Sequence, residues 1–159
     1  MNIEYRIATI KDLAIVQELN NKLFILETEK HDPHLVKDWP FSDAGTKYFE
    51  SIVKDGFVII AFDGKTPIGY LAGAKSKAYS YSNLIVAELD NMFVEQEYRG
   101  HGVGKLLFQQ FKDWVKAQDI SRIKVSAYAK NKSALAFYRS VGFEDFAIHL
   151  HCKVVAQKT

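Results

Sequence analysis

Residues 88–114 constrain the fold of this chain more than any other part of its sequence. They begin with a pattern typical of a buried strand, pass through a cluster of glycines, and end in apolar residues at helical spacing. The glycines are Gly100, Gly102 and Gly104, and the apolar residues of the helical pattern are Val103, Leu106, Leu107, Phe111, Trp114 and Val115. We therefore predict a strand, a tight turn and an amphipathic helix with one packed face.

A helix that begins with glycines is suited to binding an anion. Its first backbone N–H groups have no acceptor within the helix, and the helix dipole adds partial positive charge there. A phosphate is the most natural ligand for such a place. The stretch is not a Walker loop, which needs glycine at Arg99 and serine or threonine at Leu106. It is not a dinucleotide-binding fingerprint either, because that motif needs glycine at Lys105.

The glycine stretch resembles a loop of a known superfamily. Arg99, Gly102 and Gly104 fit the Arg/Gln-x-x-Gly-x-Gly/Ala pattern of the pyrophosphate loop in the GNAT superfamily of acyl-CoA N-acyltransferases. Taken alone, the glycines could simply permit a tight turn between strand and helix, since isolated glycine patterns are common.

A second GNAT signature follows in the order expected for that superfamily. Residues 131–143 resemble an asparagine followed by Ala-x-x-Phe-Tyr and then by Gly-Phe. The two motifs are independent, so together they are far more specific than either one. The resemblance is close over residues 84–146, whereas residues 1–83 agree only in the order of elements.

The resemblance implies a position for acetyl-CoA as acyl donor. The backbone of Met92, Phe93 and Val94 would bind the pantetheine arm as an added strand. Asn131 would contact the pantetheine or the adenine, and Tyr138 would lie beside the thioester sulfur. The other cofactor positions are the pyrophosphate loop and one residue of the second motif: Arg99, Gly100, His101, Gly102, Val103, Gly104, Lys105 and Ala134. Ordinary structural roles are the alternative, with Asn131 as a helix cap and Tyr138 as a core aromatic.

Acetyl transfer to an amine requires a proton acceptor, because an aliphatic ammonium has a pKa of about 10. Glu88 and Asp90 are two residues apart on the predicted strand, so we expect them to share a face with Met92 and Val94. Two neighbouring carboxylates repel, which raises the proton affinity of one of them. We predict that Glu88 is the base, directly or through a water, and that Tyr138 protonates the leaving thiolate. A solvated stripe or structural ion pairs are the alternative.

Four residues are candidates for contact with the acceptor. Asp90 is one candidate because a carboxylate can bind a cationic substrate. Residues 27–41 read as a long loop, which tends to be functional, and it carries His31 and Trp39. An exposed loop anchored by Trp39 is an equal alternative. His149 is a candidate on the predicted last strand, and its His-x-His pattern lacks an evident third ligand, so no metal is predicted.

The remaining patterns predict an α/β fold with a mixed, mainly antiparallel sheet of about seven strands and about four helices. Residues 3–8, 57–62, 67–74, 123–127 and 146–155 read as further strands, and residues 12–24, 42–54 and 131–141 read as further helices. Residues 63–66 read as a hairpin turn. An exposed final strand would make a homodimer plausible.

Bulk properties fit one globular domain over residues 1–159, with 48% hydrophobic and 25% charged residues. The balance of 21 basic against 19 acidic residues gives no reason to expect a nucleic-acid or membrane partner. The N-terminus lacks the apolar core of a secretory signal, so a cytoplasmic location is the default expectation. The single cysteine, Cys152, excludes an internal disulfide and is expected in the core.

The sequence therefore predicts an acetyl-CoA-dependent N-acetyltransferase that acts directly on a primary amine of a small molecule. One alternative acceptor is a protein, through its N-terminus or a lysine. An alternative of another class is a non-catalytic regulatory module that binds acyl-CoA without turnover.

Overall fold

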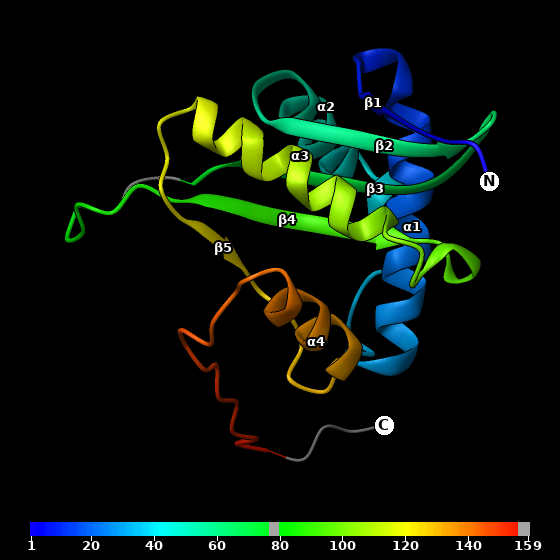
Figure 1. Cartoon of the computed structure of the whole chain (residues 1–159). Helices are drawn as coiled ribbons and strands as arrows, with labels where there is room; N and C mark the ends of the chain where they lie inside the picture. The colour runs from blue at the N-terminus through cyan, green and yellow to red at the C-terminus, as the bar shows by residue number, and fades with distance from the viewer. Residues whose placement is uncertain (77–79, 156–159) are drawn as a thin grey trace.

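The chain folds around one sheet, seen in a computed structural model that describes residues 1–76 and 80–155. In these residues five strands lie in the order β1-β2-β3-β4-β5 (Figure 1). They are β1 (Ile3–Ile7), β2 (Phe57–Asp63), β3 (Thr66–Lys75), β4 (Ala87–Val94) and β5 (Ile123–Val125). The first four pair antiparallel, and β5 pairs parallel with β4, so the predicted mixed, mainly antiparallel sheet is confirmed.

Helices cover both faces of the sheet. They are α1 (Leu13–Lys30), α2 (Asp43–Asp55), α3 (Val103–Ala117) and α4 (Lys132–Ser140), with short 3-10 turns at Ile10–Asp12, Trp39–Phe41 and Gln96–Tyr98. One apolar cluster joins α3 to the sheet, and a second joins α1 and α2 to the opposite face. Side chains cap the starts of α2 and α4, since Ser42 accepts from the Gly45 amide and Asn131 from the Ala134 amide, both at 3.1 Å.

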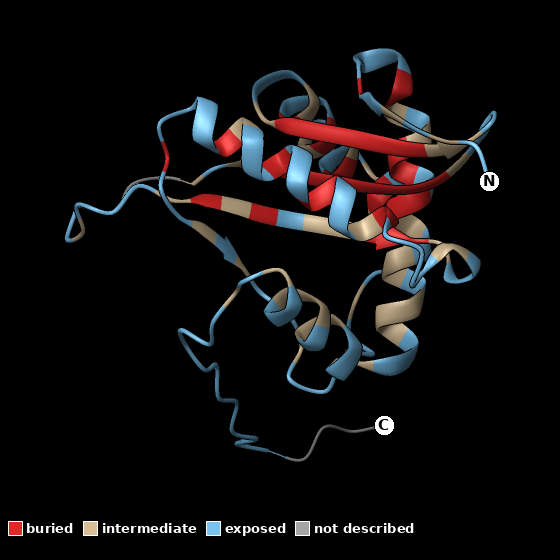
Figure 2. Cartoon of the chain, in the orientation of Figure 1, coloured by how far each residue is buried: buried red, intermediate tan, exposed pale blue. Residues whose placement is uncertain are grey.

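The middle of the sheet is the most buried part of the molecule (Figure 2). All of residues 57–61 are buried, because the two apolar clusters take alternate side chains of β2 on opposite faces. The predicted hairpin between β2 and β3 is confirmed, and Gly64 supplies its left-handed residue at φ +59°.

β4 and β5 are paired over only a short distance. Ala87, Glu88 and Leu89 lie opposite residues 123–125, and beyond Leu89 the two strands diverge. β4 nevertheless continues to Val94, paired with β3 on its other side. The edge of β4 beyond Leu89 is therefore unpaired within the described chain.

A β-bulge at Asp90 changes which residues share a face. Ala72 of β3 lies opposite Asn91, but the next residue of β3, Gly73, lies opposite Leu89, so Asp90 is an extra residue. An extra residue reverses the alternation of side chains beyond it.

The prediction that Glu88 and Asp90 share a face with Met92 and Val94 is wrong for this reason. Met92 and Val94 pack in the α3 cluster. Glu88 lies opposite Ala74, which packs on the α1 and α2 side, and Asp90 bonds to Tyr48 of α2.

Two other predicted boundaries also differ from the structure. α1 continues to Lys30, so the connection to α2 begins at His31 and not at residue 27. Residues 146–155 do not form a strand: they extend from α4 on the side away from the sheet (Figure 1). We call residues 146–155 the C-terminal arm. Its side chains are exposed, including Cys152, which was expected in the core.

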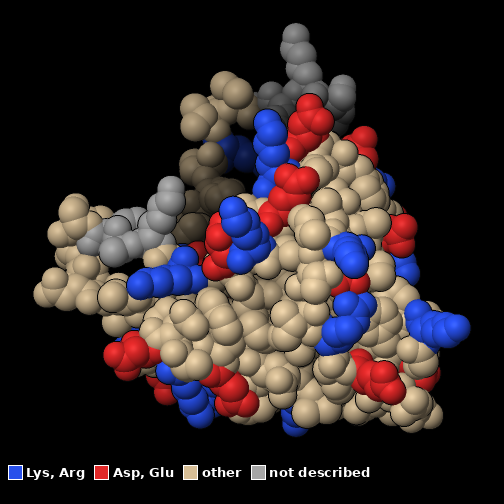
Figure 3. Space-filling model, turned by 90° about the horizontal axis from the view of Figure 1, so that it is seen from above, with Lys and Arg blue, Asp and Glu red and all other residues tan. Residues whose placement is uncertain are grey.

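The surface is electrically mixed. Basic and acidic side chains are interspersed over the face shown in Figure 3, in keeping with a formal net charge of +2. Among the described residues, no helix combines the length and the apolar character that crossing a membrane requires.

Candidate active site

The start of α3 lies very close to β4 and α4. A Cβ added at Gly104 would come within 2.9 Å of the Met92 Cε atom and 3.3 Å of the Phe137 ring. These distances are shorter than ordinary van der Waals contact, so a side chain at this position would require the flexible end of Met92 and the Phe137 ring to move. The predicted pyrophosphate loop is thereby brought to the point where the free edge of β4 ends.

Gly100 and Gly102 shape the turn before α3. Both have left-handed backbones, with φ of +80° and +85°. A Cβ added at either would have no atom within 4 Å, so both glycines border open space. The first helical bond runs from the Leu106 amide to the Gly102 carbonyl at 3.0 Å. The amides of residues 103–105 precede it and can donate to a ligand at the positive end of the helix dipole.

The other residues of the loop divide into structural and exposed positions. Arg99 donates from Nε to the Val94 carbonyl at 2.7 Å, and its guanidinium lies 5.7 Å from the Phe93 ring centroid. It therefore fastens the loop to β4. His101 and Lys105 are exposed, whereas the Val103 side chain is in the core, which leaves only its backbone for a cofactor.

Asn131 caps the start of α4 through a hydrogen bond with Ala134. The Asn131 Oδ1 atom accepts from the Ala134 amide and from the Ser133 hydroxyl, both at 3.1 Å. This is the capping role that the sequence offered as the alternative to cofactor contact, and it leaves the Asn131 amide group for other partners.

Tyr138 lies on α4 against the α3 cluster. Its ring packs edge-on against Phe137 and Phe143, at centroid distances of 5.4 and 5.5 Å. Burial, followed by the negative charge of Glu27, raises the pKa of Tyr138 to about 12. The hydroxyl forms no hydrogen bond with another described residue. A phenol held protonated in this way can act as a proton donor.

Glu88 and Asp90 have different surroundings. The Glu88 carboxylate lies 3.2 Å from the Lys124 ammonium, so it is part of an ion pair. Asp90 accepts from the Tyr48 hydroxyl at 2.8 Å. The pKa of Asp90 is raised, first by the loss of hydration where its carboxylate meets Tyr48 and to a lesser extent by Glu88, although the residue as a whole is exposed.

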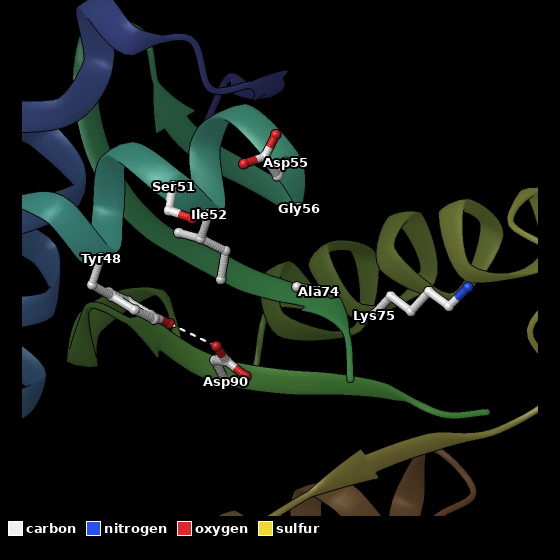
Figure 4. Close-up of a pocket in the computed structure, with 8 residues that line it drawn as sticks. All are labelled: Tyr48, Ser51, Ile52, Asp55, Gly56, Ala74, Lys75 and Asp90. Carbon is white, nitrogen blue, oxygen red and sulfur yellow. Dashed lines mark hydrogen bonds between the residues drawn. The ribbon is translucent and has the colours of Figure 1, made fainter. Parts of the chain in front are cut away.

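Asp90 borders a pocket of about 250 Å³ between α2 and the sheet (Figure 4). The Tyr48 hydroxyl points across it to the Asp90 carboxylate. The remaining lining residues are Ser51, Ile52, Asp55, Gly56, Ala74 and Lys75.

A buried polar network lies behind this part of β4. Asn20, on the packed face of α1, is fully buried and donates to the Tyr70 hydroxyl at 2.7 Å and to the Asn91 side chain at 2.9 Å. Asn91 in turn donates to the Tyr48 hydroxyl at 2.8 Å. The network thus links α1, α2, β3 and β4 beneath the bulge, and it fixes the strand there.

The other three residues predicted to contact the acceptor, His31, Trp39 and His149, lie apart from one another. His31 stacks on Tyr128 at a centroid distance of 5.6 Å, near the end of α1. Trp39 stacks on Phe24 at 5.6 Å and packs against the α1 and α2 cluster, so it anchors its connection. His149 lies in the exposed arm. Among the described residues, no group of three or more His, Cys, Asp or Glu side chains could hold a metal ion.

Sequence reasoning missed polar residues on the inward face of α1, namely Asn20 and Glu27. Their spacing did carry a signal, because Val16, Asn20, Leu23 and Glu27 follow the helical repeat of the apolar stripe. A polar residue on such a stripe indicates a buried hydrogen bond or a functional group. Tyr70 and Tyr128 were missed as well, because they lie outside both motifs.

A model of the acetyltransferase (GNAT) family matches residues 15–143 of this chain. That range includes the free edge of β4, the glycine-led start of α3 and the whole of α4. An uncharacterized N-acetyltransferase of Methanocaldococcus jannaschii is 30% identical over 101 residues, which are 62% of this chain and 44% of that protein. The chain therefore spans less than half the length of this curated relative.

Solved structures with the same fold include enzymes of known type. A mutant of the BH1408 protein of Bacillus halodurans has a TM-score of 0.82 at 19% identity, with 96% of this chain and 99% of that chain covered. The aminoglycoside N-acetyltransferase AAC(6')-Iy in complex with CoA has a TM-score of 0.75 at 18% identity, with 96% and 95% covered. At such identities the likeness shows the fold.

Proposed function

The chain belongs to the acetyltransferase (GNAT) family, and on that premise we propose that it transfers the acetyl group of acetyl-CoA directly to a primary amine of a small molecule. The observation that carries the proposal is the geometry around β4. The free edge of β4 leads into the glycine-led start of α3. At that start Gly104 lies against Phe137 of α4, and Tyr138 lies on the same helix.

The residues present fit acetyl-CoA. The free edge of β4 at Met92, Phe93 and Val94 can pair with the amides of pantetheine, as a peptide does when it adds to a sheet. The amides of residues 103–105 can bind the pyrophosphate, with Lys105 exposed beside them. The open space beyond Gly100 and Gly102 leaves room for the phosphates.

The reaction then needs one proton acceptor and one proton donor. A neutral amine attacks the thioester carbon, an amide C–N bond forms, and the C–S bond breaks. Tyr138 protonates the departing thiolate, and a backbone N–H near Val94 stabilises the oxyanion. We propose no acyl-enzyme, because Cys152 lies in the exposed arm, outside the site. Glu88, the base candidate from the sequence, is already paired with Lys124.

The acceptor class is supported by the solved neighbour that acts on aminoglycosides, which are small molecules carrying amines. Carboxylates on α1 and β4 are also suited to an ammonium group. A thiol-release assay with acetyl-CoA across a panel of small amines and of peptides with a free N-terminus or lysine tests the proposal. We expect release with small amines. Release with peptides alone would show a protein acceptor, and binding of acetyl-CoA without release for any acceptor would show a binding module.

A further inference from the structure

Glu27 is the carboxylate that the proposed reaction has not yet used. It lies in the last turn of α1, is partly buried, and forms no ion pair or hydrogen bond through its carboxylate with any other described residue. Glu88 and Asp90, by contrast, are engaged with Lys124 and Tyr48. A carboxylate withdrawn from water normally has a cation or several donors beside it. Glu27 has neither in the part of the chain that the structure describes.

The groups on which Glu27 acts come from a strand, a helix and the connection before that helix. Its charge acts on the hydroxyls of Tyr70 on β3, Tyr128 before α4, and Tyr138 on α4. Among the carboxylates, Glu27 is the one whose charge is felt at Tyr138. Its charge therefore reaches the proposed thiolate-protonating group, and the contacts of Tyr128 with His31 and Asp32 hold the segment before α4 against the end of α1.

The end of α1 combines several features that favour a cation. The Glu27 carbonyl accepts from the amides of His31 and Asp32 at 2.8 and 2.9 Å, and Tyr128 stacks on His31 and donates to the Asp32 carboxylate at 3.4 Å. The carboxyl end of a helix carries partial negative charge, and phenol rings attract cations through their faces. Burial, followed by the charge of Asp32, raises the pKa of Glu27, which brings its proton affinity closer to that of a base working near neutral pH.

We propose that Glu27 binds the ammonium group of the acceptor and takes its proton, next to Tyr138. The inference rests on the proposed function and assigns its acceptor as a protonated primary amine. The ammonium gives one proton to the Glu27 carboxylate, and the neutral nitrogen attacks the acetyl carbon. The C–S bond breaks, the thiolate takes the Tyr138 proton, and the tyrosinate recovers a proton from the new amide nitrogen. The Glu27 carboxylic acid then releases its proton to solvent.

The test compares Glu27→Gln with Glu29→Gln, a matched change at an exposed position on the same turn of α1. Calorimetry measures acetyl-CoA affinity, thiol release measures turnover, and NMR titration of the CoA-bound protein with 1,4-diaminobutane measures ammonium binding. We expect Glu27→Gln to keep acetyl-CoA affinity within about threefold, to weaken diamine binding at least tenfold, and to lower kcat/KM by about 100-fold. Glu29→Gln should match the wild type in all three.

The possible failures are distinguishable. A wild-type chain that does not bind acetyl-CoA overturns the proposed function. A wild-type chain that binds acetyl-CoA but not the diamine overturns the assignment of Glu27. So does a Glu27→Gln variant with unchanged diamine affinity and turnover. A variant that loses the acid limb of its pH–rate profile while keeping its thermal unfolding temperature supports it.

Discussion

The Glu88 carboxylate lies 3.2 Å from the ammonium of Lys124, its direct neighbour across the β4–β5 pair. The pair stands one residue before these strands diverge, so it fastens them at the mouth of the proposed cofactor groove. Both side chains are partly exposed, at 32% and 44%, and such pairs contribute less than about 1 kcal/mol to stability. The pair occupies Glu88 with a protein cation, whereas the partly buried Glu27 has no such partner among the described residues.

Glu88→Gln should therefore lower kcat/KM by less than about fivefold, because a carboxylate that does not accept the proton of the substrate contributes little to the rate. Its pH–rate profile should keep the acid limb of the wild type. Thiol-release kinetics from pH 5 to 9 provide the measurement, with Lys124→Met as a control for disruption of the ion pair. If Glu88→Gln costs about 100-fold and removes the acid limb, Glu88 is the base as the sequence first suggested.

Gly102→Ala should weaken acetyl-CoA binding at least tenfold. Its φ of +85° is disfavoured for any residue with a Cβ, and the new methyl group would enter the space beyond the loop that the phosphates need. Gly64→Ala is the matched control, because Gly64 also has a left-handed backbone with open space around it but lies in the β2–β3 turn. Calorimetry should find that the control binds normally. Equal affinities for both variants would remove the loop from the cofactor site.

Tyr138→Phe should lower kcat by about 100-fold and leave acetyl-CoA affinity within about threefold, because the ring packing against Phe137 and Phe143 is kept while the proton donor is lost. Tyr98→Phe, which removes a partly buried hydroxyl bonded to Asp63 at the end of β2, is the control. Stopped-flow thiol release and calorimetry separate the two effects. A large loss of affinity with unchanged kcat would mean that Tyr138 is mainly structural.

The pKa of Tyr138 also predicts a pH dependence. Burial raises it to about 12, so the neutral phenol persists across the usual assay range, and a fall in rate from its ionisation should not occur below about pH 10. The wild type and Tyr138→Phe should therefore have the same shape of alkaline limb up to that pH. An alkaline limb in the wild type near pH 8 that is absent from Tyr138→Phe would contradict the assignment.

The parts of the site that could be predicted from the sequence are those in which neighbouring residues determine the geometry. The glycines before α3 and the Asn131 cap of α4 are local features, set by backbone conformation and a single side chain. The β2–β3 hairpin is local in the same way. Such features need no knowledge of distant contacts, which is why the sequence located them to within a residue or two.

The bulge at Asp90 could not be predicted, because it depends on the register between β4 and β3. The alternation of β4 looks regular along the chain, and nothing in it marks the extra residue. The extra residue nevertheless places Met92 toward α3 and Glu88 toward α1 and α2. Glu27 was assigned to a loop although it lies in α1. The last turn of α1 lacks the apolar residues that mark a helix in the sequence, and it is stabilised by contacts made across the fold.

The Arg6–Asp12 ion pair predicts loss of stability in acid. Two bonds of 2.8 Å from Arg6, together with the Thr9 amide, lower the pKa of the largely buried Asp12 to about 2, from an ordinary value of 3.8. A lowered folded-state pKa stabilises the protein above the unfolded value, and this contribution is lost as pH falls from about 4 to about 2.

Urea unfolding should therefore show the free energy of unfolding falling by roughly 1–2 kcal/mol from this group over that window. Asp12→Asn should be less stable than the wild type at pH 7 by a similar amount, and the difference should shrink toward pH 2. A difference that stays constant between pH 7 and pH 2 would show that the loss comes from packing and not from the charge.

The C-terminal arm shows that alternation alone does not make a strand. Phe146, Ile148, Leu150 and Val154 alternate as a half-buried strand would, yet each is between 83% and 91% exposed. A strand also needs a neighbouring edge for its backbone bonds, and the arm leaves α4 on the side away from the sheet (Figure 1). The residue before the arm, Asp145, is held by Arg139 through bonds of 2.9 to 3.0 Å.

A chain ending at Asp145 should therefore keep both its fold and its acetyl-CoA binding. It retains the pair with Arg139, and the described side chains that it loses, those of residues 146–155, are exposed, so its midpoint of thermal unfolding should change by less than about 2 °C. It should also be more soluble, because the removed residues form an exposed apolar stretch. Scanning calorimetry and light scattering of the two chains test this. A fall of more than about 5 °C would mean that the arm packs against protein surface in solution.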